Sequence, residues 1–235
     1  MAVGRRIYLK RELPDPELIR AFREIPAANT ADCMERSCGM SPRIRLMSRP
    51  KAPVSCGPAF TVKCRAGDNL GIHAAMRYVS EGDYLVVSNE GDGYRSLIGE
   101  VMMTYLYRYK KIAGIILDGP IRDIRELGEW DFPIYATGTN PAGPYKEGPF
   151  EINVPISCGG ISVDPGDVIL ADADGVIVIP RRDAPQILEA ARRFREKDRS
   201  KARDAGEGIK DFTWLDKALA AKDYEILDEL YRSRP

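Results

Sequence analysis

The chain has 235 residues, of which 44% are hydrophobic and 30% are charged, proportions that are ordinary for a soluble globular protein. Its 35 basic and 35 acidic residues cancel, so no global field favours nucleic acid or a membrane surface as its partner. The sequence has no apolar run of roughly 18 residues, and residues 1–13 lack the apolar centre of a signal peptide. We therefore expect a cytoplasmic protein that binds neither nucleic acid nor membrane.

The cysteines and the single histidine offer little for zinc binding or for nucleophilic catalysis. No two cysteines form a Cys-x-x-Cys pair and their number is odd, so we expect reduced and mostly buried thiols. His73 lies in a helical pattern, where a packed or capping histidine is a better interpretation than a general base. The cysteines are Cys33, Cys38, Cys56, Cys64 and Cys158.

The first half of the chain alternates predicted strands and helices. Residues 1–13 are read as an extended arm, and Asp15 followed by a proline marks the start of a helix. Polar and apolar residues then alternate over 59–65, which predicts a half-buried strand. A helix over 70–79, a buried strand over 84–87 and a helix from Ser96 to about Lys110 follow, separated by Gly-rich turns.

A short apolar run over residues 114–117 stands at the centre of the pattern. A Gly-Pro pair stops this run, which predicts a buried strand, and Arg122 and Asp123 follow just beyond its end. Ligands of α/β folds often bind at such strand ends, although an Arg-Asp pair that merely fixes a loop is an alternative. The helix that begins near Gly99 has N-terminal N–H groups without intrahelical partners, which is a natural anion site.

The second half is predicted to be rich in β-structure and to end in helices. A short helix over 122–130 and a strand over 133–136 precede a Gly- and Pro-rich loop over 138–149. Further strands are expected over 152–157, 161–163, 168–171 and 176–179, then a long helix from Asp183 to about Ala205 and a last amphipathic helix over 214–231. We predict one domain over residues 1–205 and a helical extension over 206–235.

Seven short motifs, in order, resemble a known family. They are Gly67-Asp-Asn-Leu-Gly-Ile-His73, Glu81-Gly-Asp83, Gly99-Glu100, Asp118-Gly-Pro-Ile-Arg-Asp123, Phe132-Pro-Ile-Tyr135, Pro165-Gly-Asp167 and Asp172-Ala-Asp-Gly-Val176. The chain is similar to the proteins named after the regulator of ribonuclease activity A (RraA), which include 4-hydroxy-4-methyl-2-oxoglutarate aldolases and 4-carboxy-4-hydroxy-2-oxoadipate aldolases. Each motif is weak alone, and the ordered set is specific. The tail beyond Gly206 is not covered.

The resemblance implies a fold, an assembly and an activity. The fold is of the α/β (α+β) class, an αββα-type sandwich around a mixed β core, assembled as a homotrimer or a hexamer with sites at subunit interfaces. The activity is a metal-dependent lyase reaction in which an aldolase cleaves 4-hydroxy-2-oxo acids to pyruvate and a second oxo acid. Oxaloacetate decarboxylase activity accompanies it.

The resemblance also assigns roles to residues. Arg122 binds substrate, Asp123 ligates a divalent metal, and the helix start at Gly99, Glu100, Val101 and Met102 holds the substrate carboxylate. We expect catalysis from Arg122, Asp123 and Glu100, with Glu100 reaching the metal through water, and an acidic residue from a neighbouring subunit, Asp198 or Glu196. The spacing from Gly99 to Arg122 is one residue longer than in relatives, with the extra residue within 107–111, where it should shift a turn rather than the site.

Retro-aldol cleavage and decarboxylation of a 2-oxo acid share a developing pyruvate enolate, whose charge a hard cation can take up. Mg²⁺ or Mn²⁺ suits a site with one or two carboxylates and several waters, one of which we expect to act as the base for the 4-hydroxyl proton. A Schiff-base aldolase would instead need a desolvated lysine, for which Lys63 is the candidate. A further alternative is a non-catalytic regulator that binds a ribonuclease.

Overall fold

The computed structural model describes residues 4–231 and divides into two compact units, the first ending at Arg195 and the second beginning at Glu196. The division falls inside helix α6 (Ala184–Gly206), ten residues before the boundary predicted after residue 205. Residues 1–3 of the predicted arm and 232–235 of the predicted extension lie outside the described residues.

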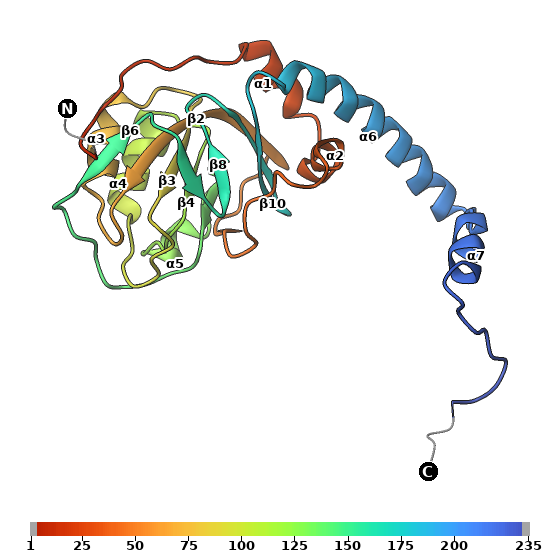
Figure 1. Ribbon diagram of the computed structural model, residues 1–235. Helices are drawn as coiled ribbons and strands as arrows, with labels where there is room; N and C mark the ends of the chain where they lie inside the picture. The colour runs from red at the N-terminus through yellow and green to blue at the C-terminus, as the bar shows by residue number, and fades with distance from the viewer. Residues whose placement is uncertain (1–3, 232–235) are drawn as a thin grey trace. The chain divides into compact units, whose positions relative to one another are not determined.

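The first unit is built on one eight-stranded sheet with the order β1-β5-β4-β3-β2-β9-β10, in which β6 also pairs with β2 (Figure 1). A separate hairpin is formed by β7 and β8. The strands are β1 (Arg45–Leu46), β2 (Val54–Cys64), β3 (Tyr84–Ser88), β4 (Gly114–Leu117), β5 (Ile134–Ala136), β6 (Phe150–Ile152), β7 (Ile156–Cys158), β8 (Ile161–Val163), β9 (Val168–Asp172) and β10 (Gly175–Ile179).

Strands β2, β3, β4 and β5 run parallel, and β3, β4 and β5 are buried along their whole length. Their near-continuous apolar sequences are typical of parallel strands covered on both faces. Because parallel strands end at the same edge, the residues that follow β2, β3 and β4 are brought together there. This edge carries the candidate site.

The long strand β2 joins two parts of the curled sheet. Residues 54–58 pair antiparallel with β9, whereas residues 59–63 pair parallel with β3. Gly57 and Pro58 stand where the partner changes, and both residue types are found in strands at bends rather than in regular central ladders. The sheet therefore folds over on itself and encloses an apolar cluster that includes Tyr84, Val86 and Ile116.

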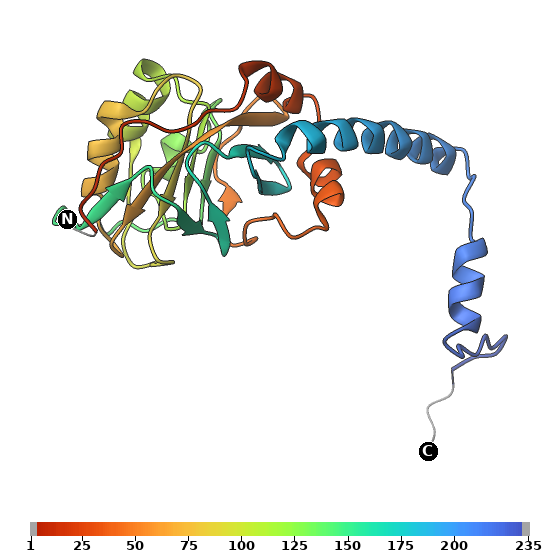
Figure 2. The ribbon, with the colours of Figure 1, turned by 45° about the horizontal axis from the view of Figure 1, so that its top comes forward.

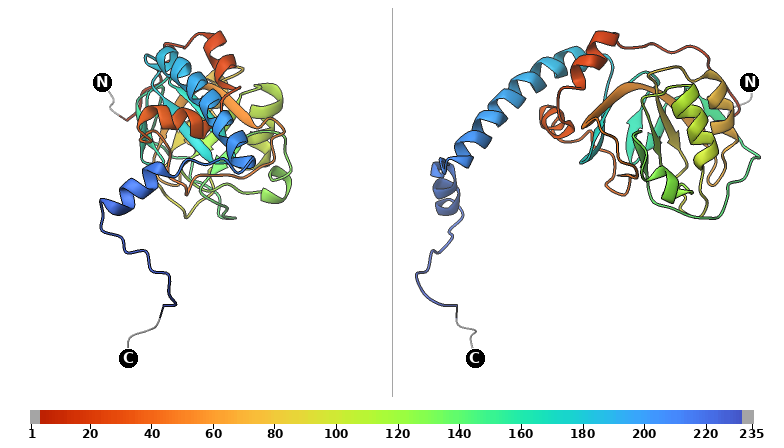
Figure 3. Two further views of the ribbon diagram at one scale, coloured as in Figure 1. Left: turned by 90° about the vertical axis from the view of Figure 1, so that its right-hand side faces the viewer. Right: turned by 180° about the vertical axis from the view of Figure 1, so that it is seen from behind.

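Helices cover the two outer faces of this folded sheet. The helices α3 (Leu70–Tyr78) and α4 (Glu100–Thr104) lie side by side on one face (Figures 1 and 3), where α3 contacts β2 and β6, and their apolar side chains share one cluster with residues of β2, β3 and β4. The opposite face packs against α1 (Pro16–Phe22), α2 (Ala27–Ala31) and the start of α6. A turn of 3₁₀ helix (Asp32–Met34) follows α2, and α5 (Ile124–Leu127) follows the site. The predicted α/β class with a mixed sheet between helical layers is confirmed.

The helix that begins at Glu100 changes its hydrogen bonding after one turn. Residues Tyr105–Tyr109 form a π-helix, and the Lys110 N–H donates to the Tyr105 carbonyl at 3.0 Å. A π-turn accommodates an additional residue within a helix without moving its first turn. The π-helix overlaps the range 107–111 in which the extra residue is expected, and the extra residue itself stays a prediction.

The N-terminal arm runs along the first unit before α1 (Figure 2). The Tyr8 N–H donates to the Ile152 carbonyl at 3.1 Å, and Arg11 forms a buried ion pair with Asp83. The Arg11 guanidinium also lies 4.9 Å from the ring centroid of Phe60. The arm is thus bound to β6 by a backbone hydrogen bond and to the turn before β3 by an ion pair.

The second unit contains the end of α6 and the short helix α7 (Thr213–Ala220). The prediction of one helix over 214–231 is wrong, because the helix ends at Ala220 and Asp223 has a left-handed backbone with φ of 56°. Isolated helices without a packed face are marginal, and no residue of α7 is buried. None of the helices within residues 4–231 has the length and apolarity that crossing a bilayer requires.

Candidate functional site

A cavity of about 430 Å³ opens at the carboxyl edge of the parallel strands, on the side of the sheet covered by α3 and α4. Ligand pockets of small molecules have volumes of this order. Its wall combines the predicted Arg122–Asp123 pair with the predicted helix start at Gly99, with the start of α3 and with the loop over 138–149. The lining residues are Asn69, His73, Ser96, Leu97, Ile98, Gly99, Val101, Met102, Arg122, Asp123, Gly143, Pro144 and Lys146.

Backbone hydrogen bonds bring the predicted pair and the helix start together. The Arg122 N–H donates to the Ile98 carbonyl at 3.1 Å, and the Leu97 N–H donates to the Pro120 carbonyl at 3.0 Å. These two bonds fasten the segment before α4 to the turn after β4. The side chains of Arg122 and Asp123 remain 49% and 41% exposed, so both are accessible to a ligand in the cavity.

Asp123 adopts a backbone conformation that is rare for residues with a side chain. Its φ of 60° and ψ of 37° lie in the left-handed region, which costs roughly 1–3 kcal/mol and persists only where the surroundings enforce it. Its Oδ2 accepts a hydrogen bond from the Glu100 N–H at 2.9 Å and lies 3.7 Å from Arg122 Nε. The strained backbone therefore turns the carboxylate onto the start of α4 and against the guanidinium.

Position 99 requires a glycine, because the side chains of Arg122 and Asp123 lie directly against its Cα. A Cβ on Gly99 would overlap Asp123 Oδ2 and would lie 2.9 Å from both Cγ and Nε of Arg122. Real Cβ atoms do not make such contacts, so any side chain here displaces the pair. The glycine thus has a steric role beside the Arg-Asp pair, in addition to its predicted place at the helix start.

The helix start presents fewer groups to the cavity than the sequence predicts. The Glu100 N–H is bonded to Asp123, and the Glu100 side chain is not among the cavity's lining residues. Val101 and Met102 do line the cavity, and within residues 4–231 no hydrogen bond is formed by their N–H groups. Among the described residues, the N–H groups of Gly99, Val101 and Met102 are thus left for the predicted carboxylate, whereas that of Glu100 is not.

Three residues that sequence reasoning did not assign to the site complete the wall. Asn69 and His73 come from the start of α3, and Lys146 comes from the loop over 138–149. Asn69 Oδ1 and His73 Nε2 are buried without a hydrogen-bond partner in the described part of the chain. Burial, reinforced by the charge of Lys146, lowers the pKa of His73 below its usual value, so the ring is neutral at pH 7. His73 is thus a pocket residue and not only a packed one.

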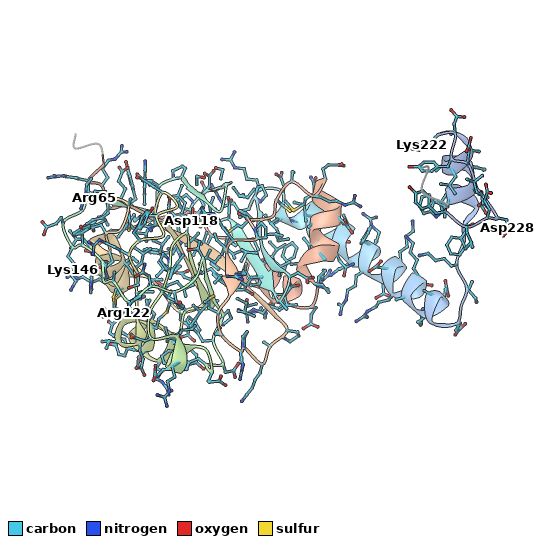
Figure 4. The ribbon with its side chains drawn as sticks, turned by 90° about the horizontal axis from the view of Figure 1, so that it is seen from below. Arg65, Asp118, Arg122, Lys146, Lys222 and Asp228 are labelled. Atoms are coloured by element: carbon cyan, nitrogen blue, oxygen red, sulfur yellow. The ribbon has the colours of Figure 1, made fainter. Side chains whose placement is uncertain are left out.

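The loop over 138–149 is held against the site by its own backbone. The Ser96 N–H donates to the Ala142 carbonyl at 2.8 Å, and the Asn69 N–H donates to the Tyr145 carbonyl at 3.0 Å. Figure 4 shows Lys146 and Arg122 at the same end of the first unit. The lining of the cavity therefore has two cations, Arg122 and Lys146, and one carboxylate, Asp123.

The remaining predicted residues lie elsewhere. Lys63 does not line this cavity but a different one on the other face of the sheet, so it is not placed to form a Schiff base with a ligand bound beside Arg122. Glu196 and Asp198 lie on α6 in the second unit, and the contribution of either to a neighbouring subunit's site stays a prediction. No cluster of three or more metal-ligating side chains occurs within residues 4–231.

Comparison with known proteins places the chain in a family. The family model RraA-like (Aldolase/RraA) matches residues 27–178. A protein of Halalkalibacterium halodurans that carries the provisional name 4-hydroxy-4-methyl-2-oxoglutarate aldolase is 36% identical over 193 residues, which cover 82% of this chain and 90% of that protein.

Two solved structures share the fold. Streptomyces coelicolor RraAS2, described as an unusual member of the RNase ES inhibitor RraA family, has a TM-score of 0.73 and 28% identity, covering 82% of this chain and 99% of that one. An uncharacterized protein of Pseudomonas syringae has a TM-score of 0.74 and 22% identity, covering 85% of this chain and 97% of that one. The chain belongs to the RraA-like family (Aldolase/RraA).

Proposed function

We propose that the protein is a divalent-metal-dependent aldolase that cleaves 4-hydroxy-2-oxo acids to pyruvate and a second oxo acid and also decarboxylates oxaloacetate. The observation that carries this proposal is the meeting of Arg122, Asp123 and the start of α4 in one cavity of about 430 Å³. The name of the H. halodurans relative supports the same reaction, with 4-hydroxy-4-methyl-2-oxoglutarate as a substrate. A substrate of this class bears two or three carboxylates, which the charges of Arg122 and Lys146 complement.

The residues of the cavity suit a hard divalent cation. Asp123 Oδ1 accepts no hydrogen bond from the described residues, and the buried Asn69 Oδ1 is also without a partner. Oxygen donors of this kind, without a nearby thiolate, are those that Mg²⁺ and Mn²⁺ prefer, and Mg²⁺ needs only one or two carboxylates because it keeps several waters. Asp123 would hold the cation. When bound, the cation would act as a Lewis acid toward the charge of the enolate.

The protein's own groups would bind and orient the oxo acid. Arg122 would donate charge-assisted hydrogen bonds to the 2-oxo oxygen, each worth about 1.5–3 kcal/mol. The unpaired N–H groups of Val101 and Met102 would donate to the 1-carboxylate. Lys146 lines the same cavity from the loop over 138–149 and would pair with the carboxylate of the part that leaves.

This orientation fits the bond changes of the reaction. A water molecule takes the proton of the 4-hydroxyl, which becomes a carbonyl, while the C3–C4 bond breaks and its electron pair forms the enolate of pyruvate. Protonation of C3 then gives pyruvate. Since negative charge grows on the 2-oxo oxygen, a guanidinium placed there in advance stabilises the transition state more than the substrate. Decarboxylation of oxaloacetate forms the same enolate and needs the same groups.

The experiment that tests the proposal measures pyruvate release from a panel of 4-hydroxy-2-oxo acids and from oxaloacetate. The purified full chain is first treated with EDTA and then assayed with and without added Mg²⁺ or Mn²⁺. With the metal, the proposal expects release faster than in the same metal-containing buffer without protein; without the metal it expects no acceleration. It also expects no covalent adduct on borohydride treatment with pyruvate. Metal-independent turnover with a trapped lysine would show a Schiff-base aldolase instead.

A regulatory role is the second candidate, because RraAS2 is described as belonging to a family of RNase ES inhibitors. A protein that acts only by binding a ribonuclease needs no metal-ready carboxylate beside a guanidinium. No pyruvate release from any acid of the panel, together with inhibition of a ribonuclease by the Asp123→Ala variant, would favour that role over the enzyme.

A further inference from the structure

A second cavity lies at the same edge of the sheet, on the opposite face from the candidate site. Its volume is about 710 Å³, and none of its lining residues is shared with the first cavity. Lys63 and Ser88 are paired in register at the ends of β2 and β3, and Asp118 follows β4, with its N–H donating to the Val87 carbonyl at 3.0 Å. Three neighbouring strand ends thus form one wall, at the position where ligands of parallel sheets bind.

The charge of the buried carboxylate of this cavity, Asp118, is balanced by a neighbouring arginine. The Asp118 side chain is only 6% exposed and forms an ion pair with Arg43, and its Oδ2 accepts a hydrogen bond from the Gly159 N–H at 3.3 Å. The Arg43 side chain is 43% exposed and lies over Gly91, where a Cβ would be 3.3 Å from one of its terminal nitrogens. A guanidinium has five N–H donors, so Arg43 keeps donors for a ligand after binding Asp118.

Lys63 and three serines of the wall have side chains without a partner among the described residues. Within residues 4–231, no hydrogen bond or ion pair is formed by the Lys63 ammonium or by the hydroxyls of Ser88, Ser157 and Ser162. Ser157 and Ser162 are partners in the register of the β7–β8 hairpin, so their hydroxyls stand side by side opposite the strand ends. One ammonium and three hydroxyls therefore face a cavity that is large enough for a small molecule.

The rim supplies an acceptor. Glu90 lines the cavity from the loop after β3, is exposed, and has a left-handed backbone with φ of 53°. Because Asp118 forms an ion pair with Arg43, the remaining polar side chains of the lining are the Lys63 ammonium, the Glu90 carboxylate and three serine hydroxyls. A bare anion could use Lys63, the free edge of Arg43 and the hydroxyls as donors, but it would be repelled by Glu90 and would leave that carboxylate without a donor. A neutral sugar would leave Lys63 unmatched.

We propose that this second cavity binds a small hydroxylated carboxylate, such as a sugar acid. Its carboxylate would pair with Lys63 and the free edge of Arg43, and its hydroxyl groups would hydrogen-bond with Ser88, Ser157 and Ser162 and donate to Glu90. The proposal is independent of the aldolase reaction, because it uses no residue of the first cavity.

The experiment measures binding of gluconate to the full chain by calorimetry, with acetate, inorganic phosphate and glucose as comparison probes. Gluconate is expected to bind at least about tenfold more tightly than each of the others, since hydrogen bonds to charged groups contribute about 1.5–3 kcal/mol each. Tighter binding of phosphate or acetate than of gluconate would overturn the proposal, and so would equal binding of glucose. No gluconate binding would also overturn it.

Variants locate the bound molecule. Lys63→Gln should weaken gluconate binding about tenfold or more, and the double variant Ser157→Ala/Ser162→Ala should remove the preference for gluconate over acetate. Arg122→Ala, in the first cavity, and Lys51→Gln, at an exposed lysine near Asp131, should leave gluconate binding unchanged. Loss of binding in Arg122→Ala with retention in Lys63→Gln would place the ligand in the first cavity and refute the proposal.

A second measurement does not depend on substitutions. Lys63 is exposed, so it reacts with an acetylating reagent in the unliganded protein. Gluconate should slow acetylation of Lys63, measured by mass spectrometry, while acetylation of Lys51 continues at the same rate. Equal acetylation of Lys63 with and without saturating gluconate would contradict the assignment.

Discussion

Asp123 Oδ2 accepts a hydrogen bond from the backbone N–H of Glu100 at 2.9 Å, although the two residues are 23 positions apart in the chain. The bond links the turn after β4 to the first residue of α4, and it leaves the other carboxylate oxygen of Asp123 without a hydrogen bond from the described residues. One side chain thus both caps a helix and offers a ligand atom to the cavity.

Arg122→Ala is predicted to lower kcat by about 10²–10³, the usual cost of removing one donor aimed at a developing oxyanion. The side chain is about half exposed, so the fold should survive, and thermal unfolding should change little. The matched control is Arg125→Ala, an exposed arginine on α5 that does not line the cavity. Equal losses of kcat in the two variants would show that Arg122 acts only through the net charge of the region.

Gly99→Ala is predicted to lower kcat at least about tenfold while the protein stays folded. The added Cβ overlaps Asp123 Oδ2, so the pair must move, and a displacement of about 1 Å at a catalytic group can cost about a hundredfold in rate. Gly93→Ala is the control, because no atom lies within 4 Å of a Cβ there and its φ is not in the left-handed region. Steady-state kinetics that are unchanged in Gly99→Ala would contradict the role of the close contact.

Glu100→Gln is predicted to raise the Mg²⁺ concentration needed for half-maximal kcat more than it raises KM for the oxo acid. The substitution keeps the backbone N–H that binds Asp123, so it tests the side chain alone. The reason for the effect is the loss of one negative charge near the carboxylate that would hold the metal. Titration of kcat with Mg²⁺ at saturating substrate measures it, and an identical metal titration in both proteins would remove Glu100 from the site.

His73 is predicted to make the stability of the protein depend on pH. Burial, together with Lys146, lowers its pKa in the folded state below the value of about 6.5 in the unfolded chain. Between these two values the unfolded state binds more protons, so stability falls as the pH drops from about 6.5 toward the lower folded pKa. Thermal unfolding of His73→Gln between pH 7.5 and pH 5 should show a smaller loss than the wild type. Parallel curves for the two proteins would contradict this account.

The sequence pattern predicts the strands of the core well, because a short, continuous apolar run indicates a buried strand whatever its neighbours in the fold. The β-branched runs that became β3 and β4 lie where the pattern puts them, and the Gly-Pro pair after Leu117 marks the end of β4. The pattern fails for the last helix. Its amphipathic period continues to Tyr231, but the helix ends at Ala220 because no partner surface within the second unit buries its apolar side.

The site was predictable only in part, because its wall is made by contacts that are distant in sequence. The resemblance to a family points to Arg122, Asp123 and the start of α4, which one cavity brings together. Lys146 reaches the same cavity because the loop over 138–149 pairs with the segment before α3, where the Tyr145 N–H donates to the Gly67 carbonyl at 2.8 Å. No local pattern encodes a pairing across so many residues.

The central claim is that the cavity stabilises the enolate of pyruvate with a cation held at Asp123 and a guanidinium beside it. Exchange of the pyruvate methyl protons in D₂O, followed by NMR, tests this without knowledge of the true substrate. The account predicts exchange that requires Mg²⁺ or Mn²⁺, stops with EDTA, and falls at least about a hundredfold in Asp123→Asn and in Arg122→Ala. Wild-type exchange no faster than in buffer with the metal, or exchange that persists in Asp123→Asn, would contradict it.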